Sequence, residues 1–116
     1  MNPQKYLDGL EEKNRLLSAK NKEYKELSVG HAETERQYNI QYAGKLVSLR
    51  MDGTPITIAK DLAKGDKVIA GFFFKMKVAE GVVNACRESM KDLRSSIDTY
   101  RSILSWLKAE KHETRG

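Results

Sequence analysis

The side chains that could carry out catalysis or bind a metal ion are few in this sequence and widely separated. The single cysteine, Cys86, and the two histidines, His31 and His112, form no closely spaced set of the kind that ligates zinc. A glycine-rich phosphate loop is also missing, because Lys64-Gly65 lacks both the spaced glycines and the Lys-Ser/Thr ending. The sequence therefore predicts no catalytic residue, no metal and no cofactor, and we expect a protein that is not an enzyme.

A regular series of cations is compatible with a different chemistry, contact with the phosphates of a nucleic acid. The series, called the basic stripe below, recurs every seven residues with one further lysine a turn away: Arg87, Arg94, Arg101 and Lys108, with Lys91. On a helix this interval places cations about 10 Å apart along one edge, where they could follow a nucleic acid backbone. The formal net charge of +5 acts in the same direction. The interpretation that we favour is that the stripe instead pairs with glutamates of an opposing helix.

The element that would carry the basic stripe is a long helix, predicted over residues 66–111. Apolar residues follow one another there at spacings of three and four, with no polar member: Ile69, Phe72, Met76, Ala79, Val83, Cys86, Met90, Leu93, Ile97, Tyr100, Leu104 and Leu107. Such a seam sustained over more than five heptads is typical of a helix packed along a partner helix. Asp66, which follows Gly65, is the expected N-cap.

A first long helix is predicted over residues 3–45, which are rich in helix-forming residues and contain no proline after Pro3. Its seam is Leu10, Leu17, Tyr24, His31 and Tyr38, with companion positions at Leu7, Asn14, Asn21, Ser28, Glu35 and Tyr42. Half of that seam is polar, so the helix needs a strongly apolar partner. The two helices, each about 60 Å long, are therefore expected to fold as an antiparallel, coiled-coil-like hairpin within a single domain, residues 1–116.

The connection between the helices, residues 46–65, has two interpretations. Asp52-Gly53 between alternating apolar residues favours a β-hairpin, with Pro55 on an edge strand. Alternatively, the first helix continues to Met51, turns at Asp52-Gly53, and is followed by a short helix over residues 58–64 that Thr57 caps. We favour the short helix and leave residues 46–56 open. Residues 112–116 are expected to form a disordered tail.

The second helix is apolar on nearly every side between residues 70 and 83, which is more than one seam can bury. Five residues are predicted to form an interface: Phe72, Phe73, Phe74, Val78 and Val82. Because consecutive residues on a helix point about 100° apart, at least one phenylalanine must lie outside the seam. Three partners could cover it: the 46–62 connection, a second copy in a homo-oligomer, or a foreign protein.

Several cellular contexts conflict with the sequence. The longest apolar run, residues 68–74, is far shorter than the roughly 20 residues that span a bilayer, so no membrane association is expected. The start of the chain does not read as a signal peptide, and a single cysteine does not suit a disulfide-stapled secreted domain. These features predict a cytoplasmic protein.

The stretch from Gly53 to Val68, followed by a long amphipathic helix, resembles small helical proteins encoded in early regions of bacteriophages and prophages. The resemblance covers roughly half of the chain and supplies no catalytic residue. It implies a phage origin, action in the host cytoplasm, and a role close to replication, recombination or host defence. The layout of two helices around a connection also resembles a beta-type prefoldin subunit, whose helices lack a segment as apolar as residues 72–83.

Taken from the sequence alone, the expected function is that of an all-helical interaction protein that forms a homo-oligomer and binds a macromolecular partner, with a protein as the favoured partner. The alternative is a nucleic-acid-binding accessory factor that uses the basic stripe.

Overall fold

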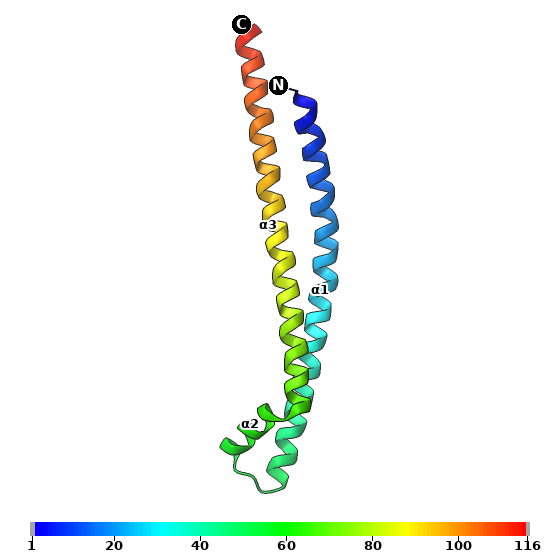
Figure 1. Ribbon diagram of the computed structural model, residues 1–116, viewed down its shortest axis with the longest axis vertical. Helices are drawn as coiled ribbons and strands as arrows, with labels where there is room; N and C mark the ends of the chain where they lie inside the picture. Colours follow the sequence, from blue (N-terminus) through cyan, green and yellow to red (C-terminus); the bar gives the residue numbers. More distant parts are fainter. Residues whose placement is uncertain (1, 116) are drawn as a thin grey trace. The chain divides into compact units, whose positions relative to one another are not determined.

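The computed structural model describes residues 2–115, and side chains as far as residue 112. It contains three helices: α1 (Pro3–Met51), α2 (Ile56–Gly65) and α3 (Lys67–Arg115) (Figure 1). Within the described residues there is no strand, and only Asn2, the residues from Asp52 to Pro55, and Asp66 lie outside the helices. The prediction of an all-helical chain is therefore confirmed.

The chain divides into two compact units. Unit 1 combines residues 1–24 with residues 85–116, and unit 2 is the continuous stretch of residues 25–84. Both long helices contribute to both units, whereas α2 belongs to unit 2 alone.

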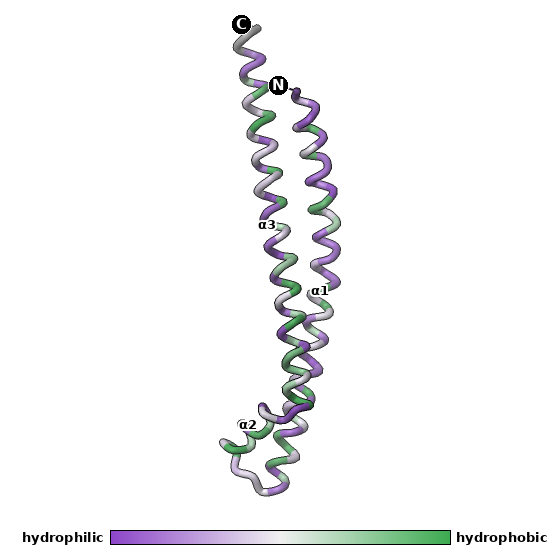
Figure 2. Tube along the Cα trace, in the orientation of Figure 1, coloured by the Kyte–Doolittle hydropathy of each residue, from purple (hydrophilic) through white to green (hydrophobic). Residues whose placement is uncertain are grey.

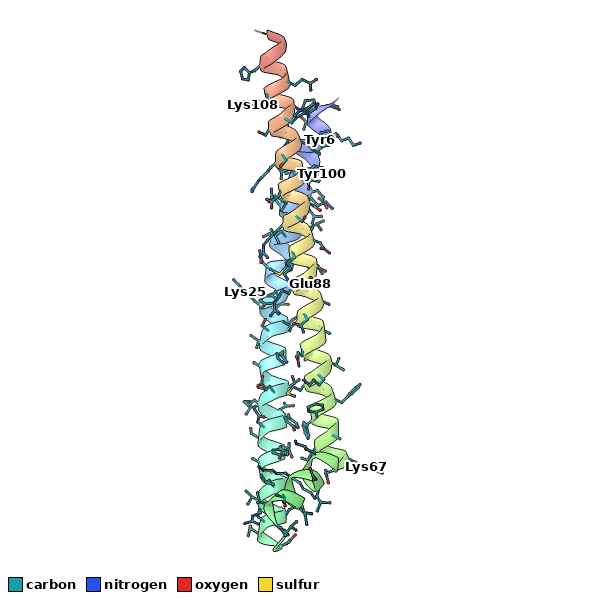
Figure 3. The ribbon with its side chains drawn as sticks, turned by 90° about the vertical axis from the view of Figure 1, so that its left-hand side faces the viewer. Tyr6, Lys25, Lys67, Glu88, Tyr100 and Lys108 are labelled. Carbon is teal, nitrogen blue, oxygen red and sulfur yellow. The ribbon has the colours of Figure 1, made fainter. Side chains whose placement is uncertain are left out.

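In unit 1, α1 and α3 pack antiparallel. The ring centroids of Tyr6 and Tyr100 lie 6.1 Å apart, and both residues are labelled in Figure 3. Closer to the middle of both helices, the Cys86 thiol donates a weak hydrogen bond to the carbonyl oxygen of Lys20, with an S···O distance of 3.7 Å. Cys86, Met90 and Ile97 are the buried apolar residues of this unit among those described.

Unit 2 is held by aromatic contacts and by a small core. The Tyr38 and Phe73 rings form a T-shaped pair with a centroid distance of 5.5 Å, and Tyr38 also stacks on Tyr42 at 5.9 Å. Nearer the turn, the Lys45 ammonium lies 3.4 Å from the Asp66 carboxylate, so α1 and α3 are antiparallel here as well. The residues buried in this unit are small or branched: Ala59, Ala63, Ile69 and Val83.

The apolar seam predicted for α3 faces inward, since each of its members is buried or half-buried. For α1 the main seam was placed correctly, and two of the companion positions, Ser28 and Tyr42, are half-buried as predicted. The other four were wrong by one residue: Leu7, Asn14, Asn21 and Glu35 are exposed, and the half-buried positions are instead Tyr6, Lys13, Lys20 and Thr34. A lysine can flank an interface because its methylene stem covers apolar surface while its ammonium stays in water. The lysines were therefore overlooked as members of the seam.

Helix α1 extends to Met51, six residues beyond the predicted end at residue 45, and the β-hairpin interpretation is wrong. The reason is the way in which the helix ends. The Thr54 amide donates a hydrogen bond to the Leu49 carbonyl oxygen, and the Gly53 amide donates one to the Arg50 carbonyl oxygen. Both N···O distances are 3.0 Å. These are the two bonds of a Schellman motif, with Gly53 at φ 88° in the left-handed position that glycine tolerates.

Helix α2 begins at Ile56 rather than at residue 58, and Thr57 lies inside it instead of capping it. Pro55 precedes the first turn, where a proline costs no hydrogen bond, and its carbonyl oxygen accepts from the Ala59 amide at 2.8 Å. The N-cap predicted for α3 is confirmed, because an Asp66 carboxylate oxygen accepts from the amides of Val68 and Ile69 at 3.0 and 3.2 Å.

The predicted disordered tail, residues 112–116, is wrong for residues 112–115, because α3 continues to Arg115. Ala109, Glu110 and Lys111 are strong helix formers, and no glycine or proline interrupts the helix before residue 116. The remaining member of the predicted tail, Gly116, lies outside the described residues.

Candidate interaction surfaces

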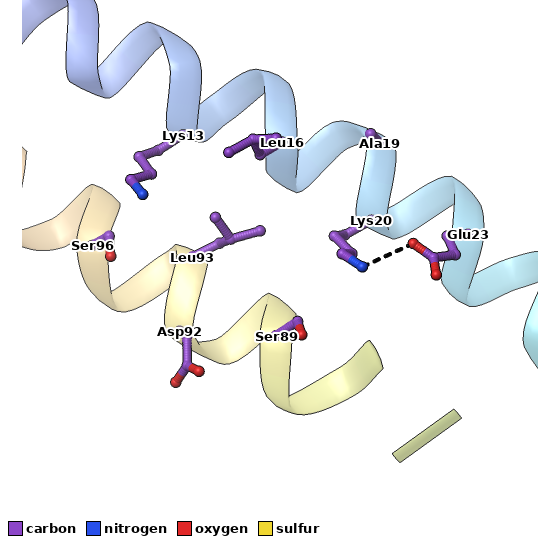
Figure 4. Close-up of a pocket in the computed structure, with 9 residues that line it drawn as sticks. All are labelled: Lys13, Leu16, Ala19, Lys20, Glu23, Ser89, Asp92, Leu93 and Ser96. Atoms are coloured by element: carbon purple, nitrogen blue, oxygen red, sulfur yellow. Dashed lines mark hydrogen bonds and ion pairs between the residues drawn. The ribbon is translucent and has the colours of Figure 1, made fainter. Parts of the chain in front are cut away.

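The surface of unit 1 contains a shallow hollow of about 360 Å³, and its lining does not resemble a catalytic site (Figure 4). The residues around it are Lys13, Leu16, Ala19, Lys20 and Glu23 on α1, with Ser89, Asp92, Leu93 and Ser96 on α3. Lys20 and Glu23 neutralise each other through an ion pair of 3.0 Å. The serine hydroxyls have no histidine beside them to act as a base, so the hollow offers no activated nucleophile.

The side chains with metal-binding potential do not gather. Cys86 is buried in unit 1, His112 is exposed in the same unit, and His31 is half-buried in unit 2. Across the part of the chain with described side chains, no group of three or more His, Cys, Asp or Glu residues is placed to hold a metal ion.

The three consecutive phenylalanines have three different environments. Phe72 is half-buried in the α3 seam. Phe73 is 43% exposed and is held between Tyr38 and the Lys77 ammonium, which lies 5.5 Å from its ring centroid. Phe74 is 68% exposed. The five residues predicted as one interface are therefore split between the inner seam, the edge and the outer face of α3.

The outer members of that set remain uncovered within the chain. Val78 is 49% exposed and Val82 is 44% exposed, like Phe74 on the face of α3 away from its seam. The interpretation in which the 46–62 connection covers these side chains is therefore wrong. Helix α2 instead buries Ala59 and Ala63, the small residues of its inner face.

Exposed large apolar side chains are concentrated in unit 2. Among the described residues, only Leu7 and Trp106 in unit 1 belong to this class. The members in unit 2 are Val29, Ile40, Val47, Met51, Ile56, Ile58, Leu62, Val68, Phe73, Phe74, Val78 and Val82. Figure 2 shows hydrophobic colouring over α2 and on successive turns at the start of α3. We call this set the apolar surface of unit 2.

The basic stripe lies in unit 1, and its members differ in what they contact. The Arg87 guanidinium donates to the Tyr24 hydroxyl at 3.1 Å and lies over the Tyr24 ring, and this hydrogen bond raises the pKa of Arg87 above its usual value. Lys91 pairs with Glu88 on its own helix at 3.3 Å.

The other three members of the stripe are Arg94, Arg101 and Lys108. All three are exposed, and Lys108 is labelled in Figure 3. Over the side chains described, none of them forms an ion pair with an acidic residue. The interpretation favoured from the sequence, in which the stripe pairs with glutamates of the opposing helix, is therefore wrong for these three residues.

Two partners of the candidate residues were not found from the sequence, namely Tyr38 beside Phe73 and Tyr24 beside Arg87. Both tyrosines are in the predicted α1 seam, which was the available signal. Matching them to α3 requires the position of the turn, which the sequence left open between two interpretations. The exposed side chains of α2, Ile58 and Leu62, were missed for the same reason.

Within residues 2–115, no part of a helix is apolar enough to cross a membrane. A scan against protein-family models and searches of the curated proteins and of the solved structures found no match. The two surfaces, one apolar and one basic, are therefore the basis on which function is argued.

Proposed function

We propose that this chain is a non-enzymatic helical interaction protein, and that it acts by self-association and protein binding through the apolar surface of unit 2. The observation that carries the proposal is the uneven distribution of exposed large apolar side chains along the chain, with all but two of those described in unit 2. Exposed apolar side chains gathered in one part of a protein are a common mark of a protein interface.

The surface area of the chain supports an interface of ordinary size. The accessible surface is 8453 Å². A compact monomer of 13.2 kDa is expected to expose about 6,400 Å² from the scaling of surface with mass. The excess on one chain, about 2,000 Å², is larger than the roughly 800 Å² that each partner contributes to a standard stable interface.

The incomplete core points in the same direction. Helix α1 contains no buried residue, and no large side chain among those described is fully buried. Because each Å² of apolar surface removed from water contributes about 25 cal/mol, a chain that leaves so much uncovered gains stability from a partner. The cytoplasmic location and the phage origin expected from the sequence remain part of the proposal.

The test is the molar mass in solution, measured by light scattering during size-exclusion chromatography over a hundredfold range of concentration. We expect a mass above 13.2 kDa that falls on dilution. Phe74→Asp should shift the protein to the monomer because it places a charge on the exposed face, whereas Asn39→Asp, an exposed site on α1 with the same charge change, should not. A wild-type chain that is monomeric at every concentration would refute self-association.

A second candidate function, binding to nucleic acid, is favoured by one observation: Arg94, Arg101 and Lys108 are exposed and carry no ion pair within the described residues. The measurement is fluorescence anisotropy of labelled DNA and RNA across a salt series. Replacing all three by glutamate should reduce the slope of log affinity against log salt by about 3 on duplex DNA. The matched control reverses Lys60, Lys64 and Lys67 in unit 2. Equal affinity for the stripe variant and the wild type would contradict this function.

A further inference from the structure

Helix α3 carries a second apolar seam on the side away from its contacts with α1. The inner seam includes Ile69, Phe72, Met76, Ala79 and Val83, which are buried or half-buried. On the outer face, at spacings of three, four and three, come Gly71, Phe74, Val78 and Gly81, with Val82 beside them. All of these outer residues are exposed. We call them the outer seam. Residues at this spacing line one face of a helix and suit the packing of another helix.

The two glycines of the outer seam leave its surface open. A Cβ atom built on Gly71 or on Gly81 would meet no other atom within 4 Å. A glycine inside a helix costs about 1 kcal/mol relative to alanine, and no described residue of the chain occupies the space that these two provide. Such space allows the backbone of another helix to approach closely.

The neighbouring lysines leave the outer seam free of charge. The Lys75 ammonium lies 5.8 Å from the Phe72 ring centroid, and the Lys77 ammonium lies over Phe73 while pairing with Glu80 at 3.2 Å. Both lysines are therefore held by their own chain, and the apolar stripe between them is accessible.

Two copies of the outer seam fit together by residue size when they pack antiparallel, but not when they pack parallel. If two copies cross with Val78 facing Val78, Phe74 of each copy is placed against Gly81 and Val82 of the other. The large ring then fills the space over a glycine. In a parallel pair, Phe74 would meet Phe74 and Gly81 would meet Gly81, which crowds one level and leaves a void at the other.

We propose that the outer seam of α3 binds the same seam of a second copy, antiparallel and with a twofold axis at Val78. This inference rests on the proposed self-association and names its surface and its direction. The excess surface of about 2,000 Å² on one chain is more than the roughly 800 Å² that each partner supplies to a dimer interface of standard size.

The experiment is disulfide trapping in the full chain with Cys86→Ala, which removes the only native thiol. Single cysteines at Val78, Phe74 and Ser102 are oxidised with copper phenanthroline, and the products are separated on non-reducing gels. We expect Val78→Cys to form a covalent dimer rapidly because its two copies meet at the axis. Phe74→Cys should link poorly to itself but readily to Gly81→Cys in a mixture. Ser102→Cys, exposed in unit 1, measures random collision.

The outcomes separate the two proposals. Linking of Phe74→Cys to itself as fast as Val78→Cys would overturn the antiparallel arrangement. Linking of Val78→Cys no faster than Ser102→Cys, in a protein that light scattering shows to be oligomeric, would overturn the outer seam while leaving self-association intact. A monomeric wild-type chain would refute both.

A second pair of variants tests the space over Gly81. Gly81→Leu should weaken dimerisation at least tenfold, because the new side chain occupies the place expected for Phe74 of the other copy. Gly44→Leu makes the same change at another open helical glycine of unit 2 and should leave the dimer constant unchanged. Circular dichroism checks that both remain helical. Equal dimer constants for the two variants would count against the proposed contact.

Discussion

At the scale of single residues, the junction between α2 and α3 depends on Asp66. Its carboxylate accepts hydrogen bonds from the backbone amides of Ile69 and Val68, and it also lies beside the Lys45 ammonium of α1. The two backbone hydrogen bonds, from Ile69 first, and the charge of Lys45 hold the pKa of Asp66 below its usual value. One side chain therefore both starts α3 and ties it to α1.

The lowered pKa of Asp66 determines how this residue makes the stability of the fold depend on pH. A carboxyl group whose pKa is lower in the folded chain stabilises the fold fully above its unfolded pKa, about 3.8, and loses that effect as the pH falls through the folded value. We expect Asp66→Ala to lower the midpoint of thermal unfolding at pH 7 and to lose less stability than the wild type between pH 5 and pH 2. Asp66→Asn can still cap the helix, so its unfolding midpoint at pH 7 should lie between those of the wild type and of Asp66→Ala. An unchanged midpoint for Asp66→Ala would contradict the capping role.

Gly53 is the other residue on which the local fold depends, because its φ of 88° is strained for any residue with a Cβ. Gly53→Ala should reduce the free energy of unfolding by about 1 kcal/mol, measured by urea denaturation. The control is Gly30→Ala, at a helical glycine with open space around it. A loss at position 30 as large as that at position 53 would rule out backbone strain as the cause.

At the scale of elements, the inner face of each long helix was predicted more accurately where its apolar pattern is stronger. The seam of α3 has no polar member, so its helix and its inward face could be predicted residue by residue. The seam of α1 includes half-buried lysines such as Lys13 and Lys20, whose stems pack while their charges remain in water. A pattern of apolar residues cannot locate such positions, and four of the six companion residues were displaced by one.

The turn between α1 and α2 shows a different limit. Asp52-Gly53 suits a β-hairpin and a helix C-terminus equally, because both use a glycine with positive φ. The choice depends on whether the preceding residues are helical. The hydrogen bonds at Thr54 and Gly53 decide it, and they are visible only in the structure.

For the candidate surfaces, residue type was predictable but exposure was not. The sequence identified Phe72, Phe73 and Phe74 as too many for one seam, yet their division among three environments depends on Tyr38, a residue distant along the chain. Likewise, the spacing of the basic stripe was evident, whereas the contact of Arg87 with Tyr24 required the alignment of the two helices.

Helix α1 itself provides a prediction. Gly30 and Gly44 are internal to this helix, and a Cβ atom at either position would meet no atom within 4 Å. Alanine has a higher helix propensity than glycine by about 1 kcal/mol, so Gly30→Ala and Gly44→Ala should each raise the free energy of unfolding by about that amount. Urea denaturation provides the measurement, and the double variant should be additive. A loss of stability in either single variant would indicate that a partner approaches α1 at that glycine.

At the scale of the whole molecule, the chain combines long helices with little burial. The buried apolar residues are few among those described, and several of them are alanines or of similar size. Since a typical domain is stable by only about 5–15 kcal/mol, the apolar surface left uncovered in unit 2 is large enough to change the stability of the whole chain. Association and folding are therefore expected to be coupled.

That coupling makes the thermal stability depend on protein concentration. If the folded chain dimerises, a hundredfold rise in concentration adds about 2.7 kcal/mol per dimer, which for a chain of this length raises the unfolding midpoint by about 5 °C. Calorimetry or circular dichroism at two concentrations measures the shift, provided that unfolding is reversible. Phe74→Asp should unfold at the same midpoint at both concentrations, and Asn39→Asp should keep the wild-type dependence. A midpoint for the wild type that is independent of concentration would mean that the apolar surface of unit 2 awaits a different protein rather than a second copy.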